Sequence, residues 1–213
     1  MTHDNAPRTL LQLAGADPMA GLDKTSSALL IIDAQQEYGA DGALPLTGLD
    51  PALTAIADLQ AAARGAEVPI VHVGHLGAAG SAFDPERGGR FLEPSGPQGN
   101  ETVVMKTMPN AFAGTNLAEL LQGDGIDTVV VVGFMTHMCV SSTVRAALDL
   151  GLRSVVAADA TATRDLPGAD GGGVVSATAL QTASLAGLAD RFAAVTTTPT
   201  LIDGLFAPSP AAP

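Results

Sequence analysis

The feature that most constrains the fold is a strand signal that passes into a helix signal, DTVVVVGFMTHMCVSSTVRAALDLG, at residues 127–151. The four consecutive valines at 129–132 are typical of a parallel strand that is buried on both faces. Gly133 ends this run, and beyond the next turn apolar residues recur at helical spacing until Gly151, a common helix stop. The segment therefore predicts a buried parallel strand followed by a helix.

Cys139, the single cysteine of the chain, lies at the junction between this strand and this helix. Unpaired backbone N–H groups and the helix dipole favour the thiolate form of a cysteine at a helix N-terminus. The position is equally typical of a small buried apolar residue, because free cysteines are usually found in protein cores. Position alone leaves both interpretations open.

Short aliphatic runs alternate with helical periods along most of the chain. Strands are expected at residues 28–33, 68–73, 101–106, 129–132, 153–158 and 192–195. Helices are expected at about residues 51–63, 117–121, 138–148 and 174–188. This alternation predicts a single-domain α/β fold in three layers, with a mostly parallel sheet and helices on both faces. Residues 1–24 are interpreted as an N-terminal arm, residues 25–198 as the domain and residues 199–213 as a C-terminal tail.

Composition excludes several classes of partner. Of the 213 residues 46% are hydrophobic but only 3% are aromatic, so the core is expected to be aliphatic. The formal net charge of −12 argues against nucleic acid and anionic membrane surfaces. One cysteine excludes an internal disulfide and any multi-cysteine metal site, which favours a reducing compartment. Residues 1–24 resemble neither a signal peptide nor a membrane span, so a cytoplasmic protein is expected.

Three chemically reactive side chains follow predicted strands. Asp33, Lys106 and Cys139 all fall at the carboxyl end of a strand or on the turn beyond it. Because parallel α/β sheets bind ligands at this edge, we expect the three side chains to converge. A carboxylate close to a thiol accepts its proton, and an ammonium stabilises the resulting charges. Taken singly, Asp33 is as well explained by a turn or a helix cap, and Lys106 by a solvated surface position.

The order Asp, Lys, Cys and its context resemble the isochorismatase-like cysteine hydrolases, a superfamily that includes nicotinamidases and N-carbamoylsarcosine amidohydrolases. The resemblance is carried by the segments LLIIDAQQEY, KTMPNAFAGTNL, VVGFMTHMCVSSTVRAALDLG and VVAADATATRDLP. It implies a six-stranded sheet with Rossmann-like strand order and a catalytic triad of Asp33, Lys106 and Cys139. It further implies a cis peptide bond between Phe134 and Met135, with the amides of Met135 and Cys139 forming an oxyanion hole.

The substrate pocket and the need for a metal are less constrained. Nicotinamidases of the metal-binding kind carry a histidine in the loop after the first strand, but residues 36–51 contain none. No metal and no other cofactor is therefore expected, and His72 is interpreted as structural. The long segment 74–100 is predicted to be a functional lid or a partner-binding loop. Candidate pocket residues are Gln35, Tyr38, His75, Phe112, Phe134, Thr136 and His137. A hydrogen-bonding role in the loop is as plausible for Gln35 and Tyr38, packing under the lid is the alternative for Phe112, and a turn-stabilising or solvent-facing role is the alternative for His137.

These observations predict a hydrolase that cleaves a C–N amide-type bond of a small molecule through a thioester on Cys139. One alternative is an isochorismatase-type enzyme that hydrolyses a vinyl ether with Asp33 as the acid. The other is a non-catalytic family member that serves as a binding protein. Since members of this superfamily commonly assemble, a homo-oligomer is expected.

Overall fold

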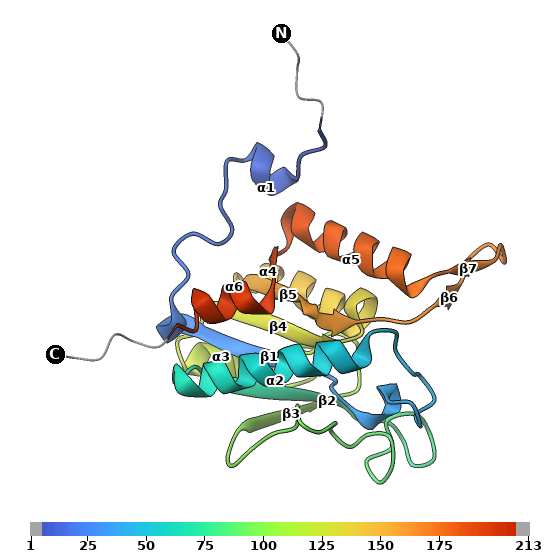
Figure 1. Cartoon of the computed structure of the whole chain (residues 1–213). Helices are drawn as coiled ribbons and strands as arrows, with labels where there is room; N and C mark the ends of the chain where they lie inside the picture. The colour runs from blue at the N-terminus through green and yellow to red at the C-terminus, as the bar shows by residue number, and fades with distance from the viewer. Residues whose placement is uncertain (1–5, 208–213) are drawn as a thin grey trace.

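A six-stranded parallel sheet forms the centre of the computed structural model, which describes residues 6–207 (Figure 1). The strand order is β3-β2-β1-β4-β5-β8, and every pair of neighbours is parallel. The strands span β1 Ser27–Ile32, β2 Ile70–His75, β3 Thr102–Lys106, β4 Thr128–Phe134, β5 Arg153–Ala162 and β8 Ala194–Thr196. The predicted α/β fold with six strands is confirmed.

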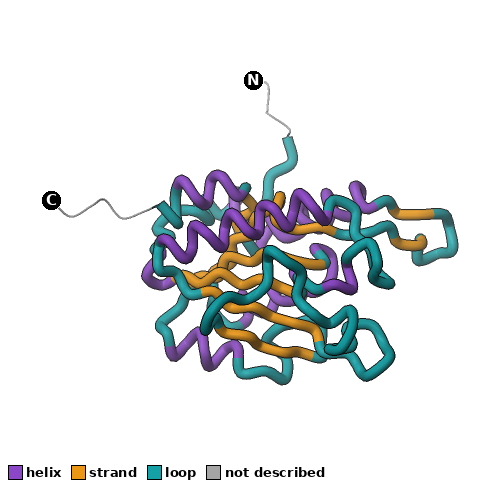
Figure 2. Tube along the Cα trace, turned by 60° about the horizontal axis from the view of Figure 1, so that its bottom comes forward, coloured by secondary structure: helices purple, strands orange, loops and turns teal. Residues whose placement is uncertain are grey.

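Helices cover both faces of the sheet, which gives the three layers seen in Figures 1 and 2. Helices α2 (Leu49–Gly65) and α6 (Thr198–Asp203) contribute to one apolar core. The other core contains residues of α3 (Leu117–Gly123), α4 (Ser141–Asp149) and α5 (Ala177–Arg191). The shorter elements are α1 Leu10–Leu13, η1 Lys24–Ser26, η2 Gln36–Tyr38, η3 Thr136–Val140, β6 Leu166–Pro167 and β7 Val174–Val175.

Strand β4 explains why the valine run was such a strong signal. Val130 and Val132 pack into the core beneath α2, whereas Val129 and Val131 pack into the core on the opposite face. All seven residues of the strand are buried. Because side chains alternate along a strand, only a continuous aliphatic run satisfies two buried faces.

The order of the strands reverses beside β1. The chain runs outward from β1 to β2 and β3, and then returns to place β4 on the other side of β1. In doubly wound sheets the loops beyond β1 and β4 then separate in opposite directions, which opens a crevice at the carboxyl ends of these two strands. Asp33 follows β1 directly and Cys139 lies in η3, just after β4.

Gly133 allows β4 to approach β1 closely at this end. Its φ is +104°, and a Cβ atom here would lie 2.0 Å from the carbonyl oxygen of Ile32. The register between β4 and β5 also shifts between Val131 and Gly133. A side chain at position 133 would therefore push apart the two strands that carry the site.

The long segment after β2 is fixed to the rest of the site by backbone hydrogen bonds. The Gln36 and Glu37 amides donate to the carbonyls of Arg90 and Gly88, both over 2.8 Å. The amide of Leu92 donates in turn to the Ala34 carbonyl over 2.8 Å. This part of the segment predicted as a lid is thus joined to residues 34–37 and forms one wall of the region beyond β1.

Parts of the predicted N-terminal arm and C-terminal tail also pack on the domain. Within the predicted arm, α1 lies against α5, where the Leu10 amide donates to Asp190 Oδ1 over 2.9 Å. The Arg153 side chain binds backbone carbonyls of residues 18, 20 and 21. Within the predicted tail, α6 and the buried Leu201 and Phe206 extend the core beneath α2. The parts of the arm and the tail at residues 1–5 and 208–213 lie outside the described residues.

Two further segments differ from the sequence-based expectation. Residues 166–167 and 174–175 pair as a small antiparallel hairpin, β6–β7. Helix α5 consequently begins at Ala177 rather than at residue 174. Ser176 caps it by accepting a hydrogen bond from the Ala179 amide.

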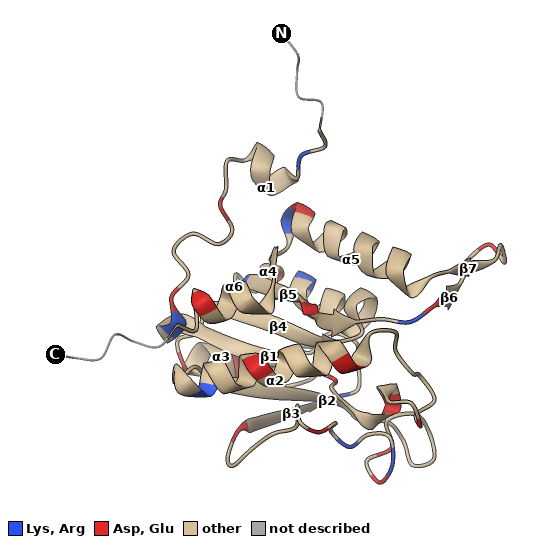
Figure 3. Ribbon diagram, viewed as in Figure 1, with Lys and Arg blue, Asp and Glu red and all other residues tan. Residues whose placement is uncertain are grey.

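Across residues 6–207 no helix is both long and apolar enough to cross a membrane. Figure 3 shows Lys and Arg as short blue segments in separate parts of the ribbon.

Candidate active site

Asp33, Lys106 and Cys139 meet at the carboxyl edge of the sheet, although 73 and 33 residues of chain separate neighbouring members. Lys106 Nζ donates to Asp33 Oδ2 over 2.6 Å and to Cys139 Sγ over 3.5 Å. The side chains of Asp33 and Lys106 are fully buried, and Cys139 is 4% exposed. The structure therefore brings together the three side chains that the sequence places at separate strand ends.

Asp33 is held in an unusual backbone conformation. Its φ of +49° lies in the left-handed region, which aspartate tolerates better than most residues. The Asp33 amide donates to the Val73 carbonyl over 2.8 Å, and the Asp33 carbonyl accepts from the Gln35 amide over 2.8 Å. The carboxylate consequently has a fixed orientation, with Oδ2 on Lys106 and Oδ1 buried without a hydrogen-bond partner among the described residues.

Burial dominates the electrostatics of the site. Loss of hydration raises the pKa of Asp33, although the charge of Lys106 and its hydrogen bond act in the opposite direction. Loss of hydration and the charge of Asp33 raise the pKa of the Cys139 thiol to about 12, against the charge of Lys106. Burial therefore favours the protonated thiol, against the thiolate that a position at a helix N-terminus favours. The sulfur lies in the π-helical turn η3, directly before α4.

The turn between β4 and Cys139 has the form that the resemblance implies. The peptide bond between Phe134 and Met135 is cis, and Met135 directly precedes η3. The Met135 carbonyl accepts from the amides of Met138 and Val140, over 3.0 and 3.3 Å. The Met135 and Cys139 residues proposed for an oxyanion hole thus lie on one short turn, and both are buried.

Aromatic rings line the region beside Asp33. Tyr38 makes edge-to-face contacts with Phe134 and with Phe83, at centroid distances of 6.0 and 5.3 Å. Burial, followed by the charges of Asp33 and Cys139, raises the pKa of the Tyr38 hydroxyl, which keeps it a neutral donor. Phe83 also contacts the ring of His75 at 5.0 Å. Phe83 was not predicted as a site residue, because nothing in an aperiodic loop indicates which of its residues folds back on the sheet.

Gln35 and Thr136, two of the predicted pocket residues, are committed to holding the backbone. Gln35 Nε2 donates to the carbonyls of His75 and Gly89, over 2.9 and 2.7 Å, and its Oε1 accepts from the His75 amide over 2.8 Å. Thr136 Oγ1 donates to the Ala162 carbonyl over 3.0 Å. Both side chains are fully buried. The Gln35 side chain therefore has the hydrogen-bonding role in the loop that the sequence left open, and the Thr136 hydroxyl binds the end of β5.

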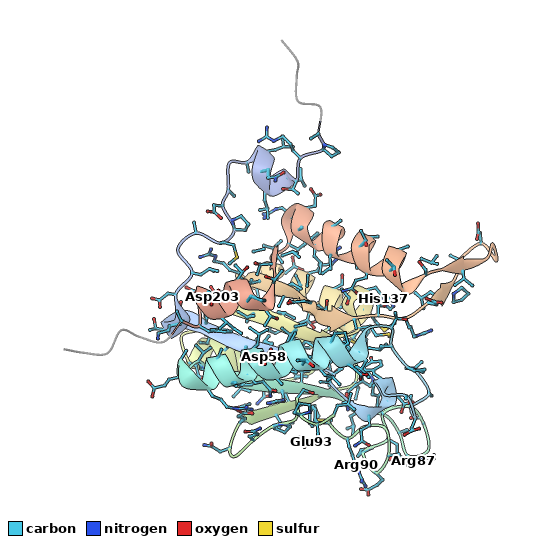
Figure 4. The ribbon with its side chains drawn as sticks, viewed as in Figure 1. Asp58, Arg87, Arg90, Glu93, His137 and Asp203 are labelled. Atoms are coloured by element: carbon cyan, nitrogen blue, oxygen red, sulfur yellow. The ribbon has the colours of Figure 1, made fainter. Side chains whose placement is uncertain are left out.

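His137 and Phe112, two further candidate pocket residues, are both partly buried. His137, labelled in Figure 4, is half-buried at the carboxyl edge of the sheet, and its Nδ1 lies 2.6 Å from Thr163 Oγ1. Burial, and then the charge of Arg164, lowers the pKa of His137. Phe112 is partly buried against the core cluster that contains Cys139. Thr163 and Arg164 were not predicted as site residues, although the segment DATATRDLP that contains them was part of the resemblance.

His72 binds Glu101 rather than one of the three reactive side chains. It is fully buried in β2, and its Nε2 lies 2.8 Å from Glu101 Oε2, which also accepts from Arg64. Burial lowers the pKa of His72, so the neutral ring is favoured. Within residues 6–207 no group of three or more His, Cys, Asp or Glu side chains is arranged to hold a metal ion.

Comparison with known proteins agrees with the geometry. Residues 27–200 match the model of the isochorismatase domain. The chain is 37% identical over 177 residues to the secreted isochorismatase effector Isc1 of Verticillium dahliae, covering 82% of this chain and 90% of that protein. It is 32% identical to a maleamate amidohydrolase of Pseudomonas putida, over 61% of this chain and 68% of that protein. The crystal structure of an isochorismatase from Pseudomonas putida KT2440 superposes with a TM-score of 0.85 at 43% identity, covering 92% and 99% of the two chains.

Proposed function

This chain belongs to the isochorismatase family of hydrolases, and on that basis we propose that it is a cysteine-dependent amidase acting on a small molecule. The observation that carries the proposal is the ammonium of Lys106, which donates both to Asp33 and to Cys139. A thiol and a carboxylate that share one cation are the groups that acyl transfer through a thioester requires. The similarity to a maleamate amidohydrolase supports a C–N bond as the bond that is cleaved.

In the first step the thiol loses its proton as it attacks the substrate carbonyl. The raised pKa of Cys139 means that the thiol keeps its proton until substrate is present. Asp33 Oδ1, which is buried without a partner among the described residues, takes that proton as general base. The raised pKa of Asp33 makes it a stronger base than an exposed aspartate, and Lys106 stabilises the sulfur during the transfer. The carbonyl electron pair moves to oxygen, where the amides of Met135 and Cys139 are proposed to stabilise it.

In the second step the tetrahedral intermediate releases the amine. The C–N bond breaks, and Asp33 returns the proton to the departing nitrogen, which leaves a thioester on Cys139. Water then attacks the thioester, and Asp33 accepts its proton as base. The C–S bond breaks, the carboxylic acid product is released, and the proton passes from Asp33 to the sulfur, which regenerates the free thiol. Lys106 keeps its charge through both steps, so that the buried carboxylate and sulfur are never left without a counter-charge.

The substrate is expected to be a small amide, urea, carbamoyl compound or cyclic imide. The experiment screens these classes with the wild-type protein and with Cys139→Ala and Cys139→Ser, and looks by mass spectrometry for an acyl adduct. We expect either replacement to lower amidase turnover by about 10³-fold or more, because the nucleophile is lost. The peptide containing Cys139 should carry the acyl group of a slow substrate.

Two outcomes would replace this function by its alternatives. Vinyl-ether hydrolysis that survives Cys139→Ser would assign the chemistry to acid catalysis by Asp33 alone. Absence of any turnover or acyl adduct across the screen would favour a binding role. Assembly into a homo-oligomer and a cytoplasmic location remain predictions, which light scattering of the purified protein and cell fractionation would decide.

A further inference from the structure

Lys106 reaches its partners by crossing a strand. It lies at the end of β3, whereas Asp33 follows β1, and β2 runs between these two strands. Neighbouring strands are about 4.8 Å apart, so the lysine side chain, the Asp33 side chain and the hydrogen bond between them together span roughly two strand spacings. His75 is the last residue of β2 and is the register partner of Lys106. The intervening strand therefore places an imidazole beside the path that the lysine side chain follows.

The ammonium of Lys106 has as many acceptors as it has protons. In addition to Asp33 and Cys139, it contacts His75 Nδ1 at 3.2 Å. An ammonium carries three N–H groups and no lone pair, so it can only donate. His75 Nδ1 must then provide a lone pair, which makes the ring neutral with its proton on Nε2.

His75 is itself held in place for this contact. Its backbone N–H and C=O are both bonded to the side-chain amide of Gln35, and its ring contacts Phe83. Burial, and then the charge of Lys106, lowers the pKa of His75 and so preserves the neutral ring at neutral pH. Asp33 and Cys139 are bonded to the same ammonium, and Tyr38, whose pKa is raised by burial and by the charges of these two groups, contacts the same Phe83 ring.

We propose that His75 is a positioning residue, a neutral acceptor that fixes the third N–H of Lys106 and so aims the other two at Asp33 and Cys139. The effect of His75 on turnover rests on the proposed amidase function, whereas the contact between His75 and Lys106 does not. Without His75, one N–H of a fully buried ammonium would lack an acceptor. The ammonium would then rotate or withdraw to satisfy it, and the sulfur would lose part of its cationic support.

The test uses Cys139 as its own reporter, since no other cysteine is present. The rate constant for alkylation by iodoacetamide is measured between pH 7 and 9 for wild type, His75→Leu and His75→Asn. The asparagine oxygen reproduces an acceptor near the position of Nδ1, whereas leucine provides none. Because the reaction consumes the thiolate, its rate reports how strongly Lys106 stabilises the sulfur.

We expect His75→Leu to be alkylated about tenfold more slowly than wild type at each pH, and His75→Asn to stay within about threefold. A merely structural role predicts the opposite sign, because a loosened site exposes the sulfur and speeds its alkylation. Equal rates for wild type and His75→Leu, or a faster His75→Leu, would overturn the proposal. Cys139→Ala, which must take up no reagent, is the control for the assignment of the signal.

A second measurement uses only the wild-type protein and so does not depend on whether a variant folds. Nitrogen-15 NMR of histidine-labelled wild-type protein reports which ring nitrogen of His75 carries the proton, with the resonance assigned through contacts to Phe83. Protonation of Nε2 alone is expected at pH 7.5, and a proton on Nδ1 would contradict the proposal. Neither measurement uses a substrate. Survival of amidase activity in Cys139→Ala would refute the proposed function and leave the role of His75 in orienting Lys106 intact.

Discussion

Replacement of Lys106 by methionine should convert a buried ion pair into a buried lone charge. Both partners are fully buried and 2.6 Å apart. Removal of one member of such a pair typically destabilises a protein by about 3–5 kcal/mol, because the remaining charge has neither water nor a counter-ion. We therefore expect Lys106→Met to lower the free energy of unfolding by roughly that amount at pH 8.

The loss should depend on pH in a defined direction. Burial already raises the pKa of Asp33, and removing Lys106 eliminates the charge that opposes this effect. The folded variant then binds a proton that the unfolded chain releases. Its stability falls by about 1.4 kcal/mol per pH unit, from the unfolded pKa near 4 up to the folded pKa. The deficit relative to wild type should accordingly be small near pH 5 and largest near pH 8.

Urea denaturation followed by far-UV circular dichroism at pH 5 and pH 8 measures this difference through the transition midpoint. The matched control is Asp33→Asn combined with Lys106→Met, which removes both charges and should recover most of the stability at pH 8. A single variant as stable as wild type at pH 8 would refute the reasoning. A double variant no more stable than the single one would refute it as well.

Gly133→Ala should lower the free energy of unfolding by more than about 3 kcal/mol and Tm by about 6 °C or more, because a Cβ would lie 2.0 Å from the Ile32 carbonyl oxygen. Gly123→Ala, with open space around it, is its control and should change stability by less than about 0.5 kcal/mol in a thermal scan. Burial acts to raise the pKa of Glu101, but hydrogen bonds led by Arg64 outweigh it and lower this pKa from 4.5 to about 2. Its stabilising contribution is therefore present above pH 4.5 and is lost as pH falls towards 2. Glu101→Gln should lower stability by about 1–3 kcal/mol at pH 7 and flatten the acid limb of a urea-midpoint profile; an unchanged acid limb would contradict this.

The alternation of aliphatic runs was sufficient to predict the sheet, because the runs that form β1, β2, β4 and β5 are largely buried on both faces. The ends of those runs then located Asp33, Lys106 and Cys139 at one edge. The hydrophobic pattern of each segment does not determine the order of the strands in the sheet. No periodicity in the sequence indicates that β2 lies between β3 and β1. The contact between His75 and Lys106 follows from that placement alone. A signal did exist, since Lys106 ends the predicted strand 101–106 and His75 lies two residues beyond the predicted strand 68–73, but only the strand order brings the two together.

Electrostatics at Cys139 was the property that sequence predicted least well. The helix N-terminal position favours a thiolate, and this effect falls off within one turn. Burial depends on how the apolar cluster that contains Cys139 packs, and the residues of that cluster come from several distant segments. Pocket residues such as Gln35 and Thr136 were ambiguous for the same reason, because their side chains bond to backbone groups supplied by distant segments.

The topology explains why a lysine, and not a shorter cation, completes this site. With β1 and β4 adjacent, the carboxylate and the sulfur come from neighbouring strands, and the outer strand β3 supplies the cation from two positions away. Only a long side chain spans that distance, and a long flexible side chain needs a fixed acceptor to hold its end in one orientation. His75, at the end of the intervening strand, is proposed to provide this acceptor, and Nζ also contacts the carboxylate and the sulfur. A strand order that placed β3 beside β1 would remove the need for it.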